Sequence, residues 1–237
     1  MVEATIETGG NAREPVALPG AQTCMKLFLK LSLAGLALSA ATAWADGLQA
    51  LEQFLRGTQQ GATTFTQTVT SPLRQGETVA RSKTSSGTFE FSRPDRFRFQ
   101  YTKPFEQTIV ADGQTLWLHD VDLNQVTSRS QKDALGSTPA ALIASGADMK
   151  GLSEAFELKA GPARDGLEWL EARPKDRNGQ LQMVRVGFRQ GQLSVLDIED
   201  SLGQRSVLTF SNWQSNAPLK AVDFKFEPPA GASVMRP

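Results

Sequence analysis

Residues 87–120 carry the feature that most limits what this chain can fold into, an alternation of aromatic and polar side chains. The aromatic positions are Phe89, Phe91, Phe97, Phe99 and Tyr101. Alternate side chains of a strand point to opposite faces, so the two runs on either side of Pro94 predict two strands with one aromatic face each. An antiparallel sheet with one solvated side gives this pattern. The aromatic face belongs either to a packed core or to an open binding surface.

A hairpin is predicted directly after these strands. Asp112-Gly113 separates the apolar runs 107–111 and 115–121, and the second run contains Trp117. Asp-Gly between two such runs favours a tight hairpin turn in which both turn residues take positive φ.

The predicted first helix spans residues 46–60, with Asp46 as its N-cap and Gly61 at its end. Its apolar stripe consists of Leu48, Leu51 and Leu55. This spacing is typical of an amphipathic helix that packs on a sheet.

A second helical segment is predicted in residues 133–145, with Thr138 as N-cap and Pro139 in the first turn. Leu142, Ile143 and their neighbours are apolar almost all round. An exposed helix has a polar face, so this one is either buried in the core or covers a cavity. Residues 148–153 predict one further short helical turn.

The second half of the chain reads as a β-meander. Strands are predicted at 155–160, 167–172, 181–188, 193–200, 205–213 and 221–226, and most are separated by glycine-containing turn pairs. With the first half, where we also expect a polar strand at 78–84, the pattern gives about ten or eleven strands. We predict a mainly β fold, one large curved antiparallel sheet with helices against one face.

The start of the sequence is typical of export. Met25 begins a short basic segment, residues 31–41 are apolar and small, and Ala43-Trp44-Ala45 fits a signal-peptidase site. We therefore interpret residues 25–45 as a secretory signal peptide and residues 46–237 as a single exported domain. Residues 1–24 are either an artefact of an upstream start, with Met25 the true start, or a disordered extension.

Charge and cysteine content exclude several classes of function. Residues 1–45 hold three basic and three acidic side chains, which leaves 22 of each (25 minus 3) in a formally neutral domain. Nucleic-acid binding requires a basic footprint, so we expect no nucleic-acid partner. The only cysteine, Cys24, precedes the predicted domain, which therefore has no disulfide.

No catalytic set is evident in the sequence. His119 is the only histidine, and neither a G-x-S-x-G nor an S-x-x-K motif is present. One histidine without cysteine is a poor basis for a metal site. We predict that the chain is not an enzyme and has no metal or cofactor.

Arg93 is the most unusual residue of the aromatic stretch. Its parity with Phe89 and Phe91 points it toward the aromatic face, where a guanidinium must meet carbonyls or carboxylates. The C-terminal carbonyls of a covering helix would suit it. Alternatively, the turn at Pro94 rotates Arg93 outward to solvent. The pattern does not choose between these two orientations.

The predicted domain resembles the periplasmic outer-membrane lipoprotein carrier family, LolA. The residues that carry the resemblance are Phe91-Ser92-Arg93-Pro94, Phe97, Phe99, Thr102, Pro104, the run 110–117, Thr138-Pro139, the run 142–144 and the run 224–231. Their order and spacing, together with the export signal, make the resemblance specific, although each motif alone is weak.

The resemblance implies an incomplete antiparallel β-barrel, here of about eleven strands, with a helical lid over its apolar concave face. In the family, this cavity receives lipoprotein acyl chains from the LolCDE transporter of the inner membrane and delivers them to the outer-membrane receptor LolB. We expect a monomer whose lid is held closed by Arg93. The expected lipid-binding residues are Phe89, Phe91, Phe97, Phe99, Trp117, Leu142 and Ile143.

Three hypotheses remain open at this point. The chain is a lipoprotein chaperone, a carrier of another lipid on the same fold, or a structural β-domain whose aromatic face is simply a filled core. Cavity volume separates the third hypothesis from the first two: a close-packed inner side of Phe97 and Phe99 with no void would contradict both carrier hypotheses.

Overall fold

The computed structural model describes residues 46–73, 75–76, 78–135, 143–144, 148–219 and 224–236. The strands are β1 (Gln60–Thr70), β2 (Ser82–Ser92), β3 (Arg96–Lys103), β4 (Gln107–Asp112), β5 (Thr115–Asp120), β6 (Gln125–Ser130), β7 (Phe156–Ala160), β8 (Glu168–Pro174), β9 (Leu181–Arg189), β10 (Gln192–Asp200), β11 (Arg205–Ser215) and β12 (Ser233–Met235). The helices are α1 (Gly47–Gly57), α2 (Gln131–Leu135) and α4 (Met149–Ala155).

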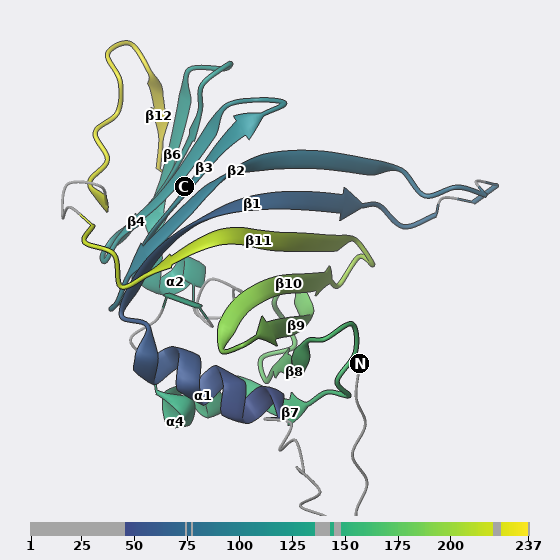
Figure 1. Ribbon diagram of the computed structural model, residues 1–237. Coiled ribbons are helices and arrows are strands. Elements are labelled where there is room, and N and C mark those ends of the chain that lie inside the picture. The colour runs from purple at the N-terminus through teal and green to yellow at the C-terminus, as the bar shows by residue number, and fades with distance from the viewer. Residues whose placement is uncertain are drawn as a thin grey trace, which may run out of the picture. The chain divides into compact units, whose positions relative to one another are not determined.

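All twelve strands in the described ranges belong to one sheet. Their order is β12-β6-β5-β4-β3-β2-β1-β11-β10-β9-β8-β7, and the two end strands do not pair with each other. Neighbours are antiparallel except β12, which runs parallel to β6. The incomplete antiparallel barrel is therefore confirmed, with twelve strands instead of about eleven (Figure 1).

The first helix ends earlier than predicted. Asp46 is its N-cap and accepts a 2.8 Å hydrogen bond from the backbone N–H of Gln49, but the helix stops at Gly57. Gly61, predicted as the end of the helix, lies inside β1. A Cβ atom there would stand 3.0 Å from the rings of Phe91 and Trp213. The glycine therefore makes room for aromatic packing and does not end the helix.

Three predictions about strands and turns were wrong in detail. The strand predicted at 78–84 begins only at Ser82, and Phe224–Phe226 is not a strand. In the β4–β5 turn only Gly113 has a positive φ, of 102°, because Asp112 is the last residue of β4. The short strand β12 was not predicted, since three exposed residues give no alternation to detect.

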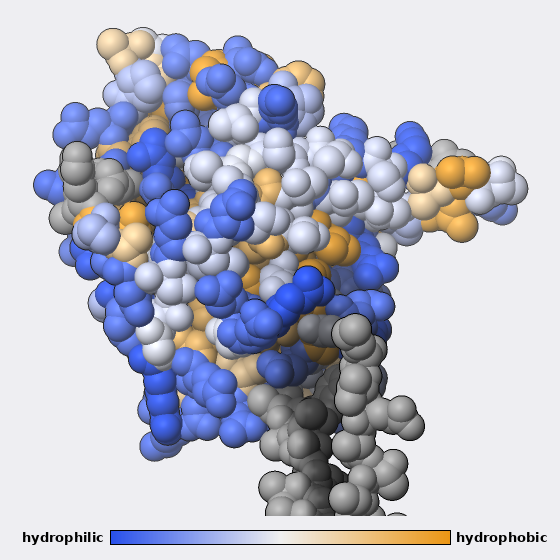
Figure 2. All heavy atoms as spheres, in the orientation of Figure 1, coloured by the Kyte–Doolittle hydropathy of each residue, from blue (hydrophilic) through white to orange (hydrophobic). Residues whose placement is uncertain are grey.

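The helices cover the concave face of the sheet. α1 and α4 lie on one side of the curved strands in Figure 1, next to β7 and β8. Leu51 and Phe54 of α1 and Leu152 of α4 belong to the same buried cluster as the phenylalanines of β2 and β3. On β1, the side chains that face away from the buried cluster belong to Thr64, Thr66, Thr68 and Thr70. The surface over β1, β2 and β11 is accordingly of intermediate hydropathy in Figure 2.

Substituting two glycines tests the assignment of Gly61. Gly61→Ala is expected to lower the free energy of unfolding by about 1–3 kcal/mol, because the added methyl group overpacks against two rings. Gly57→Ala is the matched control, because a Cβ there meets nothing within 4 Å and alanine favours the helix by about 0.5–1 kcal/mol. Urea unfolding midpoints that shift in the same direction for both variants would contradict the assignment.

Candidate functional site

Four of the predicted lipid-binding phenylalanines lie on one face of the sheet. Phe89 pairs with Phe99 and Phe91 pairs with Phe97 across β2 and β3, so all four side chains project to the same side. The rings of Phe89 and Phe99 stack with centroids 4.3 Å apart. Their exposed fractions are between 0 and 9 %. The alternation in the sequence therefore identified an inward-facing aromatic surface.

A lid covers this aromatic surface, and we define it as α1, the helical residues Ile143–Ala144 and α4. Phe54 of α1 contacts Phe91 with a ring-centroid distance of 6.1 Å and Phe188 of β9 with one of 5.8 Å. Ile143 and Ala144 are both 2 % exposed and belong to the same cluster. In this structure the concave face is closed and filled by apolar side chains, with the lid contributing part of the filling.

Trp117 lies on the other face of the sheet, which corrects its prediction as a lipid-contacting residue. The β4–β5 register pairs Trp117 with Val110, whereas Ala111 pairs with Phe97 and shares its face. The indole Nε1–H donates to Asp112 Oδ2 at 3.0 Å. Its ring packs on Phe226, with centroids 5.5 Å apart. The alternation along β5 places Leu116 and Leu118 inward and Trp117 outward.

The remaining predicted residues divide between described and undescribed positions. Ile143 belongs to the lid and its side chain is buried in the same cluster as the aromatic surface. Leu142, Thr138 and Pro139 fall outside the described residues. His119 contacts the ring of Phe226 at 5.8 Å on the outer face. No group of three or more histidine, cysteine, aspartate or glutamate side chains that could hold a metal ion is found in the described ranges.

Sequence reasoning missed several aromatic residues of the same surface. These are Phe54, Phe65, Phe188, Phe210 and Trp213. Phe65 lies 5.5 Å from Phe99 and 5.0 Å from Tyr101, and Trp213 lies 6.3 Å from Phe91. Phe54 lies on α1 and the other four lie on strands, and which elements become neighbours depends on long-range pairing. Only the β1–β11 pairing brings the two halves of the aromatic surface together.

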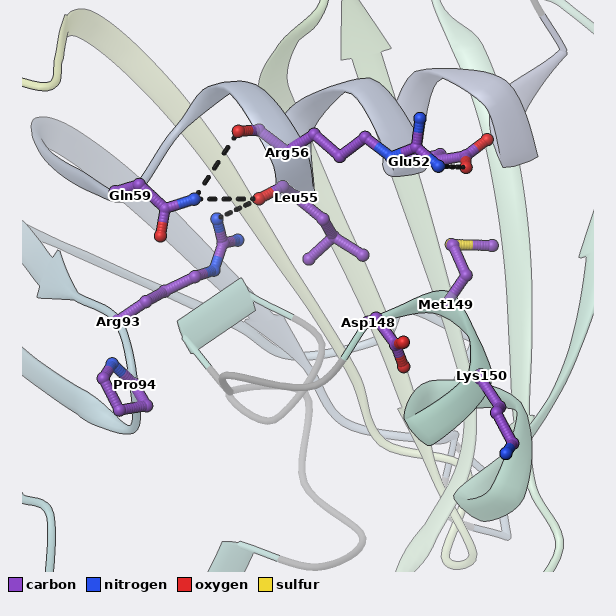
Figure 3. Close-up of a pocket in the computed structure, with 9 residues that line it drawn as sticks. All are labelled: Glu52, Leu55, Arg56, Gln59, Arg93, Pro94, Asp148, Met149 and Lys150. Atoms are coloured by element: carbon purple, nitrogen blue, oxygen red, sulfur yellow. Dashed lines mark hydrogen bonds and ion pairs between the residues drawn. The ribbon is translucent and has the colours of Figure 1, made fainter.

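Arg93 points inward and joins the sheet to the lid. Its Nη2 donates to the carbonyl of Ile143 at 2.7 Å, and Nη1 donates to the carbonyl of Leu55 at 3.2 Å and also to that of Thr58. The bond to Leu55 is drawn in Figure 3. Leu55 lies in the last turn of α1 and Thr58 caps it, so the guanidinium meets the negative end of the helix dipole. The inward orientation is thereby established.

The environment of Arg93 is largely apolar. Its guanidinium carbon lies 5.1 Å from the ring centroid of Phe54 and 5.2 Å from that of Phe91, which allows cation–π attraction. Nε is buried without a hydrogen-bond partner among the described residues. Burial lowers the pKa of the Arg93 guanidinium to about 10, so the side chain remains a cation at neutral pH. These hydrogen bonds therefore offset the cost of desolvating the guanidinium, and their net contribution to the free energy of lid closure is moderate.

A cleft of about 700 Å³ opens beside this contact (Figure 3). Its apolar lining includes Leu55 and Met149, which face each other from α1 and α4. Charged side chains border it on the same two helices, among them Glu52 and Lys150. Arg93 itself lines the cleft, so any group that enters between the two helices approaches the hydrogen bonds that hold the lid.

Asp112 organises the β4–β5 turn through three hydrogen bonds. Its Oδ1 accepts from the backbone N–H groups of Gln114 and Thr115, at 2.8 and 2.7 Å, and its Oδ2 accepts from Trp117. Burial alone raises the pKa of the Asp112 carboxyl, but the hydrogen bonds outweigh burial and hold the pKa below its ordinary value. A carboxylate with a depressed pKa stabilises the fold above its unfolded pKa, and this stabilisation is lost as the pH falls through the folded pKa.

Asp112→Asn tests this pH dependence. The amide keeps the size of the side chain but removes the charge, so the variant is expected to be less stable than the parent by about 1 kcal/mol at pH 7. The difference should begin to shrink below about pH 4, where the carboxyl of the unfolded chain protonates, and it should be lost as the pH falls through the lower pKa of the folded Asp112 carboxyl. Urea titrations of both proteins at pH 7 and pH 3 measure it. A difference that is constant over this range would contradict the assigned role of the charge.

Fold and site together define a class of protein, the incomplete β-barrels whose apolar concave face is covered by helices. This arrangement suits a carrier for apolar molecules. The family model described as outer membrane lipoprotein carrier protein LolA matches residues 56–227. The chain belongs to this LolA family.

Close relatives support the same assignment. The chain is 55 % identical over 216 residues to an outer-membrane lipoprotein carrier protein of Albidiferax ferrireducens, covering 90 % of this chain and 100 % of that protein. It is 51 % identical over 203 residues to the protein of the same name from Methylibium petroleiphilum, covering 86 % of this chain and 96 % of that protein. No helix among the described residues is long and apolar enough to cross a membrane.

Proposed function

We propose that the chain is a periplasmic chaperone that binds the acyl chains of lipoproteins and carries them toward the outer membrane. The observation that carries this proposal is the aromatic concave face closed by a lid, with Arg93 as the polar contact between them. Burial of each methylene contributes about 0.8 kcal/mol, so an acylated protein needs an apolar enclosure to cross an aqueous compartment. The covered face supplies one without exposing an aggregation-prone patch.

Binding requires that the lid moves. In the closed structure the rings of Phe91, Phe97 and Phe99 are already buried by their neighbours. Acyl chains therefore enter by displacing the apolar side chains of the lid, which exchanges one set of apolar contacts for another. The void over Phe97 and Phe99 that was to mark a carrier is not found among the described residues, where both rings are buried. In this proposal the space forms only when the lid opens, and the Arg93 hydrogen bonds set the threshold for opening.

The family resemblance extends the proposal to partners and residues. LolCDE at the inner membrane would donate the cargo and LolB at the outer membrane would accept it. Phe89, Phe91, Phe97, Phe99 and Ile143 would contact acyl chains; Leu142 remains a candidate from the sequence alone. Residues 25–45 would direct export, which supports a periplasmic location.

Native mass spectrometry of the protein isolated from the periplasm distinguishes the two kinds of cargo. The proposal predicts adducts with the masses of intact lipoproteins. Adducts with the masses of free phospholipids or fatty acids alone would instead favour the second hypothesis, a carrier of another lipid on the same fold.

A further inference from the structure

Gln131 links the β2–β3 turn, which contacts the lid, to the β4–β5 turn. It is the first residue of α2 and only 4 % of it is exposed. Its Nε2 donates to the carbonyl of Asp95 at 2.5 Å, and its Oε1 accepts from the backbone N–H of Gly113 at 2.9 Å. The backbone N–H of Gln131 also donates to Gln114 at 2.8 Å. Both ends of this buried amide are therefore engaged between the β2–β3 turn and the β4–β5 turn.

The turn that Gln131 holds makes two contacts with the lid. The backbone N–H of Asp95 donates to the carbonyl of Ala144 at 2.9 Å, and Arg93 donates to the preceding carbonyl, that of Ile143. The same turn is attached on its other side, where the Arg93 N–H donates to Gln59 at 2.9 Å. Two successive lid carbonyls are thus bound by one short turn of the sheet.

The conformation of this turn needs support. Asp95 has a φ of 59°, in the left-handed region that a non-glycine residue adopts only at a cost. The bond from Gln131 fixes the carbonyl of the same residue, so it restrains the backbone conformation that directs the Asp95 N–H to Ala144. A neutral amide suits the position because it offers one donor and one acceptor to two backbone groups at once.

We infer that Gln131 is a positioning residue for lid closure, which acts by presenting the Asp95 N–H and the Arg93 side chain to the carbonyls of Ala144 and Ile143. This inference rests on the proposed function, in which opening of the lid admits cargo. Gln131 contacts no acyl chain in this arrangement. Its effect is on the fraction of molecules with the lid closed.

Two substitutions separate the two ends of the amide. Gln131→Met has a similar length but neither donor nor acceptor, so the amide protons of both Asp95 and Gly113 should exchange faster. Gln131→Glu keeps an acceptor for Gly113 and loses the donor for Asp95, so only the Asp95 proton should exchange faster. From the usual net value of one hydrogen bond we expect an acceleration of roughly 2- to 10-fold.

The matched control is Gln67→Met on β1, seven residues along the strand from Gln60, which pairs with Ser92 beside the β2–β3 turn. Gln67 also makes two side-chain hydrogen bonds, from Tyr101 at 2.9 Å and to Ser206 at 2.6 Å. Its removal should reduce global stability similarly without selective exchange at Asp95. Equal exchange at Asp95 in the Gln67 and Gln131 variants, once corrected for global stability, would overturn the inference.

A second readout keeps the inference distinct from the proposed function. A synthetic tripalmitoylated lipopeptide should bind Gln131→Met roughly 2- to 10-fold more tightly than Gln67→Met, because a larger fraction of molecules is open. If the wild type binds the lipopeptide and Gln131→Met binds it no better than Gln67→Met, the positioning role is wrong. If neither the wild type nor an Arg93 variant binds it, the carrier function is wrong, whatever the exchange rates show.

Discussion

Replacing Arg93 with leucine is expected to shift the lid toward its open form by about 10- to 150-fold. Hydrogen bonds that involve a charged group contribute about 1.5–3 kcal/mol, and 1.4 kcal/mol corresponds to a factor of ten. The substitution removes the bonds to Leu55, Thr58 and Ile143. Leucine can pack against the neighbouring phenylalanine rings and it also removes a desolvated charge, so the fold itself should survive.

Two measurements follow the open form. Hydrogen exchange of the Asp95 N–H, which donates to the lid carbonyl of Ala144, reports lid opening, and the rate of transfer of bound lipopeptide to an acceptor reports function. Transfer should slow, because closure of the lid no longer helps to expel the cargo. Arg96→Leu is the matched control: Arg96 bonds to Ser92 and lies over Phe224, at 3.4 and 5.9 Å respectively. If the Arg93 and Arg96 variants show the same hydrogen exchange and the same rate of lipopeptide transfer, Arg93 does not hold the lid closed.

Phe91→Ala is expected to cost about 3–5 kcal/mol of the free energy of unfolding, the usual range for truncating a buried phenylalanine. Phe91 is 0 % exposed and lies 5.8 Å from Phe89 and 6.3 Å from Trp213, centroid to centroid. The same truncation takes away one of the two rings beside Arg93, so it should also weaken acyl-chain binding.

Phe105→Ala is the control for this substitution. Phe105 is 71 % exposed, and its truncation should change the free energy of unfolding by no more than about 0.5 kcal/mol. Chemical denaturation of both variants gives the comparison, and lipopeptide titration of the folded fraction gives the binding effect. Similar unfolding energies for the two variants would contradict the placement of Phe91 at the centre of the covered surface.

The aromatic surface could be predicted from local sequence because the two-residue period of a strand is a local property. Phe89, Phe91, Phe97 and Phe99 needed only their alternation and the turn between them. Trp117 was predicted to bind lipid because it is a large aromatic residue, and this prediction ignored its position in the alternation. The same alternation along β5 places it outward, where Asp112 and Phe226 occupy its polar and apolar sides.

Arg93 and Gln131 show what local pattern cannot decide. Parity favoured an inward Arg93, but the turn at Pro94 left the outward orientation equally open. The carbonyls that decide it belong to Leu55, Thr58 and Ile143, which are distant in sequence. Gln131 gives no signal at all, because a single polar residue at a helix start has no period, and its partners are backbone groups of two remote turns. Long-range hydrogen bonding determined both positions.

The distribution of lipoproteins between the two membranes after depletion of this protein tests the central claim most directly. The claim predicts that lipoproteins destined for the outer membrane accumulate at the inner membrane, and that the wild-type chain restores delivery whereas Arg93→Leu does not. Normal delivery in depleted cells would contradict it.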